Sequence, residues 1–389
     1  MSSDSSTDLR DSSFPKISSQ DNLLSSSLDG TGTSQPPSDG EASKSDDTHA
    51  YRLIHDPIYG SVTIDSACAI EIMDLPEFQR LKKVLQHGIT SLIGCLPRPP
   101  VNRFDHSVGA MLLVKHVGGS EEAQLAALLH DVAHTTLSHV LDLVFGYVIH
   151  EVEKKDFLDS TTIREILTKH GFDPERVLEE ENFPLLELPS PDICADRLDY
   201  ALRDSTSFGF LSIEEAQSIF RSTVAIDGHM VLNSISHATT LANTYLQSDQ
   251  YAWANPTQKY LYQLTSEAIR LMLDLGKINK ECLWQLGDEE FWARLTSNAT
   301  PSLQTLLEKI NNRCELSELG EGFQPDSDSS ETEICTFKLK VRTIDPLVQT
   351  SDGVRRLSEV DSVFAERRLE YIKSREMPQT FVVKYLPAV

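Results

Sequence analysis

Residues 125–142, "LAALLHDVAHTTLSHVLD", decide how this sequence is interpreted. Polar groups interrupt a run that is otherwise apolar, namely His130, Asp131, His134, His139 and Asp142. A packed helix normally excludes such groups, because burying an unpaired charge or polar ring is costly. We therefore expect these side chains to be satisfied by a hydrogen-bonded core, a metal ion or a substrate.

The composition excludes several classes of protein. The chain has 389 residues, enough for one large domain or two ordinary ones. Its formal net charge of −24 argues against tight binding of duplex nucleic acid, which needs clustered Lys and Arg. The six cysteines are scattered without a CxxC pair, which is typical of reduced thiols. No secretory signal pattern and no long apolar run is present, so we expect no membrane partner. We expect a cytoplasmic protein, with the nucleus as the alternative.

Composition shifts predict four parts along the chain. The first 48 residues are rich in Ser and Asp and predict a disordered tail. The stretch 315–333 is acidic and predicts a loop or linker. The tail precedes a helical domain, 49–314, and the acidic stretch separates that domain from a small α+β C-terminal lobe, 334–389. The expected fold class is mainly α, with a helical core and a short N-terminal hairpin.

Local signals place the elements. Alternating apolar residues around Asp56, Pro57 and Gly60 predict a hairpin over 51–65. Ser212 with Glu215 three residues later predicts a capping box. Further predicted helices cover 103–117, 121–146, much of 236–311, 361–374 and a stretch opened by Ser190 and Pro191; predicted strands lie within 335–348 and 379–387.

Metal-ligand chemistry follows from the residue types in 125–142. His134 comes four residues after His130, which places both on one face if the helix persists. Imidazoles and carboxylates that converge on one point suit a divalent transition ion. Further ligands must come from elsewhere, and the candidates are His106 in "NRFDHSVGA" and Asp196 in "ADRLDYALRDS". On that second helix a dense charged side, which includes Asp199, Arg203 and Asp204, is typical of a solvated surface.

Three motifs in order, "RFDHSVGAMLLV", "AALLHDVAHTTLSH" and "ADRLDYALRDS", resemble the HD-domain metal-dependent phosphohydrolases. They are most similar to the deoxynucleoside triphosphate triphosphohydrolase branch, which includes the vertebrate sterile-alpha-motif and HD-domain dNTPases. The similarity spans about residues 51–230 and, more weakly, the C-terminal lobe. The sterile-alpha-motif domain has no counterpart in this sequence.

The resemblance implies a role for each site residue. A divalent metal (Zn, Mn, Fe or Co, with Mg accompanying the substrate as a further candidate) would be held by the His, His-Asp and Asp of the motifs. Proton transfer would fall to two histidines with an orienting aspartate. The implied metal ligands are His106, His130, Asp131 and Asp196; the implied catalytic residues are His134, Asp142 and His150; the implied substrate-binding residues are Gln86, Arg103, His139, Arg197 and Tyr200.

Two departures from the branch concern the substrate. The usual Gly-His-Gly-Pro is Ala133-His134-Thr135-Thr136 here, so the backbone after His130 is expected to follow a different path. The branch also brings an Arg to the terminal phosphates from a downstream helix. No Arg lies between Arg221 and Arg270, and Lys259 is the nearby cation.

The resemblance implies hydrolysis of a nucleotide, most specifically of a dNTP such as dGTP to deoxynucleoside and triphosphate. Three alternatives stay open: an HD phosphohydrolase acting on another nucleotide or phosphate ester, an HD-fold di-iron oxygenase that uses spare histidines such as His134 and His139 for a second metal, and a non-catalytic binding protein. The family's habit also implies a homo-oligomer.

Overall fold

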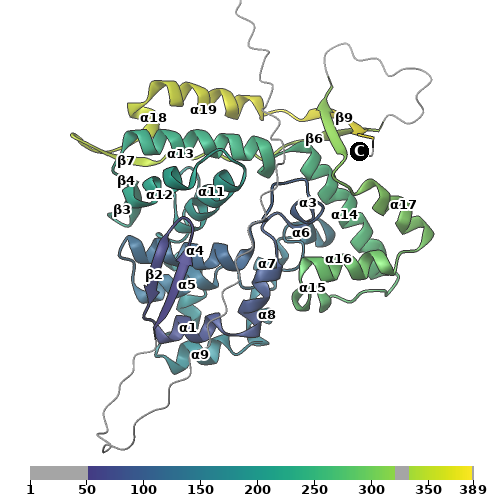
Figure 1. The fold of residues 1–389 in the computed structure, drawn as a ribbon, viewed down its shortest axis with the longest axis horizontal. Helices are drawn as coiled ribbons and strands as arrows, with labels where there is room; N and C mark the ends of the chain where they lie inside the picture. Colours follow the sequence, from purple (N-terminus) through teal and green to yellow (C-terminus); the bar gives the residue numbers. More distant parts are fainter. Residues whose placement is uncertain (1–50, 320–332, 388–389) are drawn as a thin grey trace, which may run out of the picture. The chain divides into compact units, whose positions relative to one another are not determined.

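The computed structural model describes residues 51–319 and 333–387. In these residues helices dominate, and the sheets are small (Figure 1), which confirms the mainly α fold class. The predicted tail, 1–48, lies outside the described residues, as does most of the predicted acidic loop. None of the described helices is both long and apolar enough to cross a lipid bilayer.

The predicted N-terminal hairpin is present. Strands β1 (Arg52–Asp56) and β2 (Gly60–Ile64) pair antiparallel. The Asp56 carboxylate closes the turn by accepting the backbone N–H groups of Ile58 and Tyr59, and Gly60 supplies a positive φ of 77°. Short helices follow the hairpin: α1 (Ala67–Met73), α2 (Pro76–Gln79), the 3₁₀ turn η1 (Arg80–Lys83) and α3 (Gly88–Leu92).

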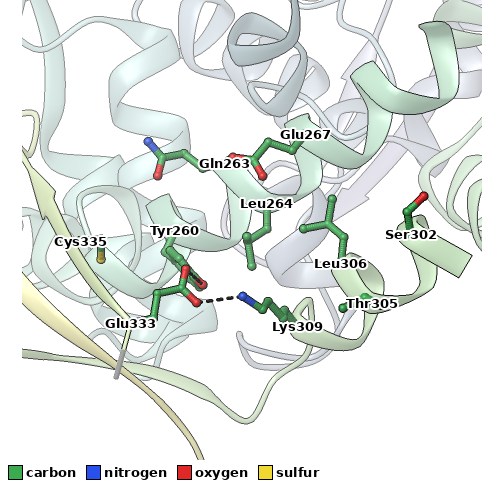
Figure 2. A pocket seen from close by; sticks show the side chains of 10 residues that line it. All are labelled: Tyr260, Gln263, Leu264, Glu267, Ser302, Thr305, Leu306, Lys309, Glu333 and Cys335. Carbon is green, nitrogen blue, oxygen red and sulfur yellow. Dashed lines mark hydrogen bonds and ion pairs between the residues drawn. The ribbon is translucent and has the colours of Figure 1, made fainter. Parts of the chain in front are cut away.

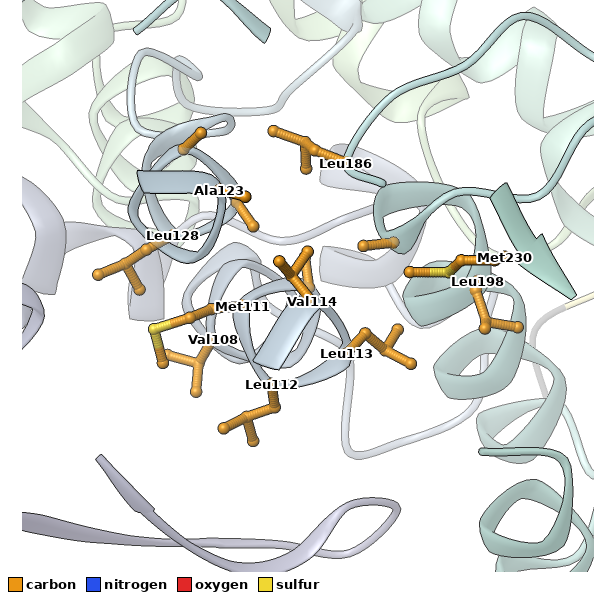
Figure 3. Close-up of a cluster of buried hydrophobic side chains, with 14 of the residues drawn as sticks. Val108, Met111, Leu112, Leu113, Val114, Ala123, Leu128, Leu186, Leu198 and Met230 are labelled. Atoms are coloured by element: carbon orange, nitrogen blue, oxygen red, sulfur yellow. The ribbon is translucent and has the colours of Figure 1, made fainter. Parts of the chain in front are cut away.

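The main core is built where helix α4 (Arg103–His116) packs against α5 (Glu121–Leu129) and α11 (Ala195–Ser207). Figure 3 shows Met111, Leu113 and Val114 of α4 among side chains from these neighbours. Helices α4 and α11 carry His106 and Asp196, and α5 leads directly into His130 and Asp131. The packing of the core therefore also brings the residues implied as metal ligands together.

Truncation within this core tests its contribution. Leu128 is fully buried in the cluster, so Leu128→Ala is expected to lower the free energy of unfolding by about 2–5 kcal/mol in a urea titration. The matched control is Leu53→Ala, because half of the Leu53 surface is exposed; its expected change is about 0.5 kcal/mol or less. Equal losses for the two variants would contradict this placement of the core.

The single helix predicted over 121–146 is wrong. Helix α5 ends at Leu129, residues 130–139 form a loop, and α6 begins at Val140 and ends at Phe145. Leu137 and Ser138 have φ values of 54° and 50°, which an α-helix cannot contain. The two histidines His130 and His134 therefore do not share a helical face.

The predicted helix start at Ser190 and Pro191 is also wrong. Helix α11 begins at Ala195, with Cys194 as its N-cap. The Ser190 hydroxyl donates to the carbonyl of Thr343 rather than to a helix terminus, which places it in the preceding loop.

Helices fill most of the chain between 149 and 309. The capping box at Ser212 is confirmed, since both of its hydrogen bonds to Glu215 are present at the start of α12. The elements are α7 (Ile149–Val152), α8 (Lys154–Asp159), α9 (Ile163–Lys169), α10 (Pro174–Val177), η2 (Glu180–Asn182), α12 (Ile213–Ser222), β3 (Thr223–Ile226), β4 (His229–Leu232), α13 (Ile235–Ser248), the π-helical turn η3 (Asp249–Trp253), α14 (Pro256–Asp274), α15 (Cys282–Gln285), α16 (Asp288–Ser297) and α17 (Pro301–Lys309).

The C-terminal segment is joined to earlier elements through two sheets. Strand β7 (Leu347–Thr350) pairs in parallel with β4, and β9 (Gln379–Tyr385) pairs antiparallel with β5 (Cys314–Glu318). Helix α19 packs on α13 (Figure 1). The elements are β5 (Cys314–Glu318), β6 (Ile334–Phe337), β7 (Leu347–Thr350), β8 (Gly353–Arg356), α18 (Leu357–Val360), α19 (Ser362–Ser374) and β9 (Gln379–Tyr385), in sheets ordered β3-β4-β7-β8 and β5-β9-β6.

Candidate metal centre and active site

Three ligand-type side chains from separate segments of the chain meet at one point. His106 comes from α4, His130 directly follows α5, and Asp196 lies in the first turn of α11. The Nε2 atom of His106 is 3.1 Å from Nε2 of His130 and 3.0 Å from Oδ1 of Asp196. Nε2 of His130 lies 3.5 Å from the same Asp196 oxygen. Distant motifs therefore converge within metal-ligand range.

The hydrogen bonds made by the Nδ1 atoms of His106 and His130 leave both Nε2 atoms available to a cation. Nδ1 of His106 donates to Oδ2 of Asp199 at 2.7 Å, and Nδ1 of His130 donates to the carbonyl of Ala127 at 2.7 Å. When Nδ1 carries the proton, the Nε2 lone pair is free to bind a metal. Two lone pairs then face each other across 3.1 Å, an arrangement that a divalent ion satisfies. The donor set of two imidazoles and a carboxylate suits Zn, Mn, Fe or Co.

Asp131 lies beside this group. Its Oδ2 pairs with Arg103 and is 3.7 Å from Nε2 of His106, and its Oδ1 is 3.8 Å from Nε2 of His130. Burial alone would raise the pKa of Asp131, but the Arg103 charge and the adjacent histidines hold that pKa well below its usual range. Asp131 is thus an ionised carboxylate next to the three other ligand-type groups.

The carboxylates around His106 favour a positive charge at its imidazole. Burial lowers the pKa of His106, yet hydrogen bonds to Asp196 and Asp199 outweigh burial and raise that pKa to about 10. Carboxylates that stabilise a proton on His106 would stabilise a divalent ion in its place. The electrostatics therefore agree with the geometry.

A second polar group lies next to the first. The rings of His134 and His150 stack with centroids 3.6 Å apart. Asp142 lies beyond them: its Oδ2 accepts Nδ1–H of His139 at 3.0 Å, and its Oδ1 is 3.8 Å from Nδ1 of His150. His134 also connects to the first group, because its Nε2 is 3.2 Å from Oδ1 of Asp131.

Both stacked imidazoles are held neutral. Burial lowers the pKa of His150 to about 3, and the charges of His139 and Arg103 act in the same direction. Burial and Arg103 likewise hold the pKa of His134 well below its usual range. Both imidazoles therefore have a lone pair in place of a second proton. Ligand atoms of His139, Asp142 and His150 also lie within 4.8 Å of one another, so this second group has the residue types of a metal site.

The charged side of α11, a pattern that taken alone is typical of a solvated surface, is buried. Asp199 is completely buried and Arg203 nearly so, and Arg203 bridges the carboxylates of Asp199 and Asp56. The Tyr59 hydroxyl also donates to Asp199, at 2.6 Å. This network orients His106 through Asp199 Oδ2, a role that the sequence interpretation missed. The spacing of Asp196, Asp199 and Arg203 along one helix face was the available signal.

Gly109 makes room for this network. A Cβ atom at position 109 would lie 1.9 Å from Oδ1 of Asp199 and 2.2 Å from Nη2 of Arg203. Glycine therefore allows α11 to approach α4 closely enough for Asp199 to reach His106.

The residues implied as substrate-binding have different surroundings. Within the described residues, Oε1 of Gln86 and Nη2 of Arg103 are buried without a hydrogen-bond partner. The His139 side chain is 52% exposed. Tyr200 shares a 2.5 Å hydroxyl contact with Tyr245. These groups therefore differ in the polar atoms that they leave free to contact a ligand.

Arg197 is engaged by the protein itself. Its Nη1 donates to the carbonyls of Leu188 and Asp192, and its Nη2 lies 3.4 Å from Glu187. These contacts tie down the loop that precedes α11. A phosphate-binding role for Arg197 would compete with them and stays a prediction.

A neighbouring polar contact was also missed by the sequence interpretation. The carboxylate of Asp204 accepts the indole N–H of Trp253 at 2.7 Å and lies 3.0 Å from Nε2 of His87. The Trp253 ring packs edge-on against Tyr200. No signal in the sequence placed Trp253, from the π-helical turn, beside α11.

A cavity of about 390 Å³ lies elsewhere, between α14 and α17 (Figure 2). None of the four residues implied as metal ligands lines it. Three of its polar groups already pair with one another, because Glu333 accepts from Tyr260 and from Lys309. The cavity is therefore not part of the site described above.

Comparison with known proteins agrees with this geometry. The HD domain family model matches residues 103–204, the segment that contains all four residues implied as ligands. The metal-dependent phosphohydrolase cns2 of Cordyceps militaris is 39% identical over 335 residues, which cover 83% of this chain and 93% of that relative. The chain belongs to the HD-domain metal-dependent phosphohydrolases.

A second relative matches a smaller part of this HD-domain phosphohydrolase, and a solved structure resembles its fold. The zebrafish deoxynucleoside triphosphate triphosphohydrolase SAMHD1 is 32% identical, but over 113 residues, which are 25% of this chain and 18% of that protein. A phosphohydrolase structure from Bacteroides thetaiotaomicron superposes with a TM-score of 0.58 at 20% identity, covering 87% of this chain and 100% of that chain. The likeness to that structure supports the fold, while family membership implies a divalent metal.

Proposed function

We propose that this HD-domain phosphohydrolase cleaves a phosphate ester bond of a nucleotide, and specifically converts a dNTP such as dGTP to deoxynucleoside and triphosphate. The observation that carries the proposal is the convergence of His106, His130 and Asp196, with Asp131 and a neutral His134 beside them. The partial similarity to SAMHD1 supports the dNTP as the substrate.

The ligand-type residues would hold a divalent ion, and such an ion supplies Lewis acidity toward phosphoryl oxygens. Arg103 keeps Asp131 ionised, and its buried Nη2 is available for a phosphate oxygen. His106 is oriented by Asp199 through Nδ1, so its Nε2 would be the atom that holds the ion. These side chains bind and orient the phosphate group.

Proton transfer falls to the stacked histidines. Nδ1 of His134 and Nδ1 of His150 are buried without a hydrogen-bond partner among the described residues. A neutral imidazole there takes a proton from the attacking water and returns one to the leaving oxygen of the sugar. Asp142, 3.8 Å from His150, stabilises the imidazolium that forms in between.

A second candidate is hydrolysis of a nucleotide or phosphate ester that lacks a triphosphate tail. The observation that favours it is the pairing of the cations on α14. Lys259 donates to the carbonyl of Lys338, and Arg270 donates to the carbonyls of Leu143 and Val144. Both side chains therefore already hold protein carbonyls, and a role in binding terminal phosphates, like that of the Arg in the dNTPase branch, would compete with these contacts.

A product screen separates these candidates. The full chain is loaded with Mn, Mg, Fe or Co and incubated with each dNTP, the corresponding monophosphates and a simple phosphate ester. Triphosphate release from a dNTP is the expected result, and orthophosphate release from the other substrates alone supports the second candidate. Absence of any product with every metal contradicts both, and two irons per chain with oxygen consumption would instead indicate the oxygenase alternative.

A further inference from the structure

The loop that follows the His-Asp pair has an unusual backbone. Leu137 and Ser138 are consecutive non-glycine residues with φ of 54° and 50°. Such a conformation is costly for residues with a Cβ atom and persists where the surroundings hold it in place. Most of the contacts that hold this loop come from beyond the segment matched by the HD family model.

Asp288 provides the central contact. It is the first residue of α16 and is completely buried. Its Oδ1 accepts the backbone N–H of Leu137 at 2.8 Å and the hydroxyl of Thr136 at 3.2 Å. Its Oδ2 accepts the backbone N–H of Leu85 at 3.0 Å. One carboxylate thus joins the loop to the residue that precedes Gln86.

The adjacent helix α15 adds two contacts to the same loop. The backbone N–H of Thr136 donates to the carbonyl of Leu283 at 2.8 Å. The indole N–H of Trp284 donates to the carbonyl of Ala133 at 3.0 Å. Residues 283–288 therefore hold the loop at three of its positions.

Further hydrogen bonds connect this loop to Asp131, one of the residues implied as metal ligands. The Ser138 hydroxyl donates to the carbonyl of Leu85 at 2.7 Å and accepts Nε–H of Arg103 at 2.9 Å. Arg103 in turn pairs with Asp131. A shift of Leu137 would therefore displace Ser138, and with it the guanidinium that orients Asp131.

We propose that Asp288 is a positioning residue for the metal-dependent reaction, acting through the Leu137–Ser138 backbone and Arg103 on Asp131. The proposal rests on phosphohydrolase chemistry at the metal cluster but not on the identity of the substrate. Asp288 neither touches the cluster nor belongs to the three family motifs.

The substitution Asp288→Asn tests this role. The amide keeps the size of the carboxylate but has one acceptor oxygen, so it cannot accept from both Leu137 and Leu85. We expect kcat to fall about 10-fold to 100-fold with KM changed less than about threefold, as for loss of a group that orients a metal ligand. In amide hydrogen exchange, the protection of Leu137 should fall while the amides of α4 stay protected. The matched control is Glu289→Gln, an exposed acid in the same helical turn, with no change expected.

Each outcome decides the proposal. Unchanged kcat and unchanged Leu137 protection in Asp288→Asn would overturn it, as would an equal loss in Glu289→Gln. If Asp288→Asn unfolds at a much lower urea concentration than the wild type, Thr136→Val replaces it as the test variant. Thr136→Val removes one hydrogen bond to Asp288. Faster amide exchange at Leu137 in that variant supports the proposal, and unchanged exchange overturns it. If the wild type hydrolyses no substrate, the proposed function fails while the exchange measurement still tests the loop contact.

Discussion

Replacement of Asp196 by Asn is expected to remove the bound metal and to lower kcat about 1,000-fold, which corresponds to about 4 kcal/mol of transition-state stabilisation. The Asp196 oxygen lies 3.0 Å from His106 and 3.5 Å from His130, and it is the carboxylate that closes this group. Asn has the same shape but lacks the charge that attracts a divalent ion. Metal content by elemental analysis and kcat on the substrate found in the product screen measure the effect.

The control for this variant is Asp274→Asn. Asp274 is exposed at the end of α14, so the same change in charge and shape there should leave metal content and kcat unchanged. A metal-loaded and fully active Asp196→Asn protein would contradict the assignment of the cluster as the metal centre.

The second large effect is expected for Asp199→Ala. This substitution leaves Arg203 with one carboxylate partner, Asp56, and leaves Nδ1 of His106 without its acceptor. Breaking such a buried ion pair is expected to lower the free energy of unfolding by about 3–5 kcal/mol. Loss of the group that orients a metal-binding imidazole should also weaken metal affinity about 10-fold to 100-fold. Urea unfolding and a metal titration measure the two effects separately.

Asp199→Asn distinguishes charge from geometry. The amide oxygen can still accept from His106, so metal affinity should fall less than in the alanine variant. The amide carries no charge, so Arg203 keeps Asp56 as its charged partner and stability should still fall. Equal stability of the wild type and the alanine variant would mean that the buried network does not contribute as described.

Much of the site could be anticipated from the order and spacing of the motifs. His106, the His130–Asp131 pair and Asp196 occur in separate segments, and the expectation that they converge agrees with the distances between them. The N-terminal hairpin and the capping box at Ser212 were predicted correctly as well, because each depends on a few adjacent residues. Their turn and capping chemistry is local.

Features that depend on distant partners were not anticipated. The sequence pattern favoured one helix over 121–146, since nothing near Leu137 and Ser138 signals a positive φ. That conformation is held by Asp288, about 150 positions later in the chain. Similarly, the charged face of α11 resembles a solvated surface until Asp56, Tyr59 and His106 are placed against it.

The sequence by itself thus determined which chemical groups are present, the helical character of the chain and its relationship to the HD-domain phosphohydrolases. The tertiary structure alone decided where α5 ends, which face of α11 is buried and which carboxylate orients His106. The physical reason is that motif chemistry resides in side-chain type and short-range spacing. Burial, hydrogen-bond partners and pKa shifts arise instead from groups far apart in the chain that packing brings within a few ångströms.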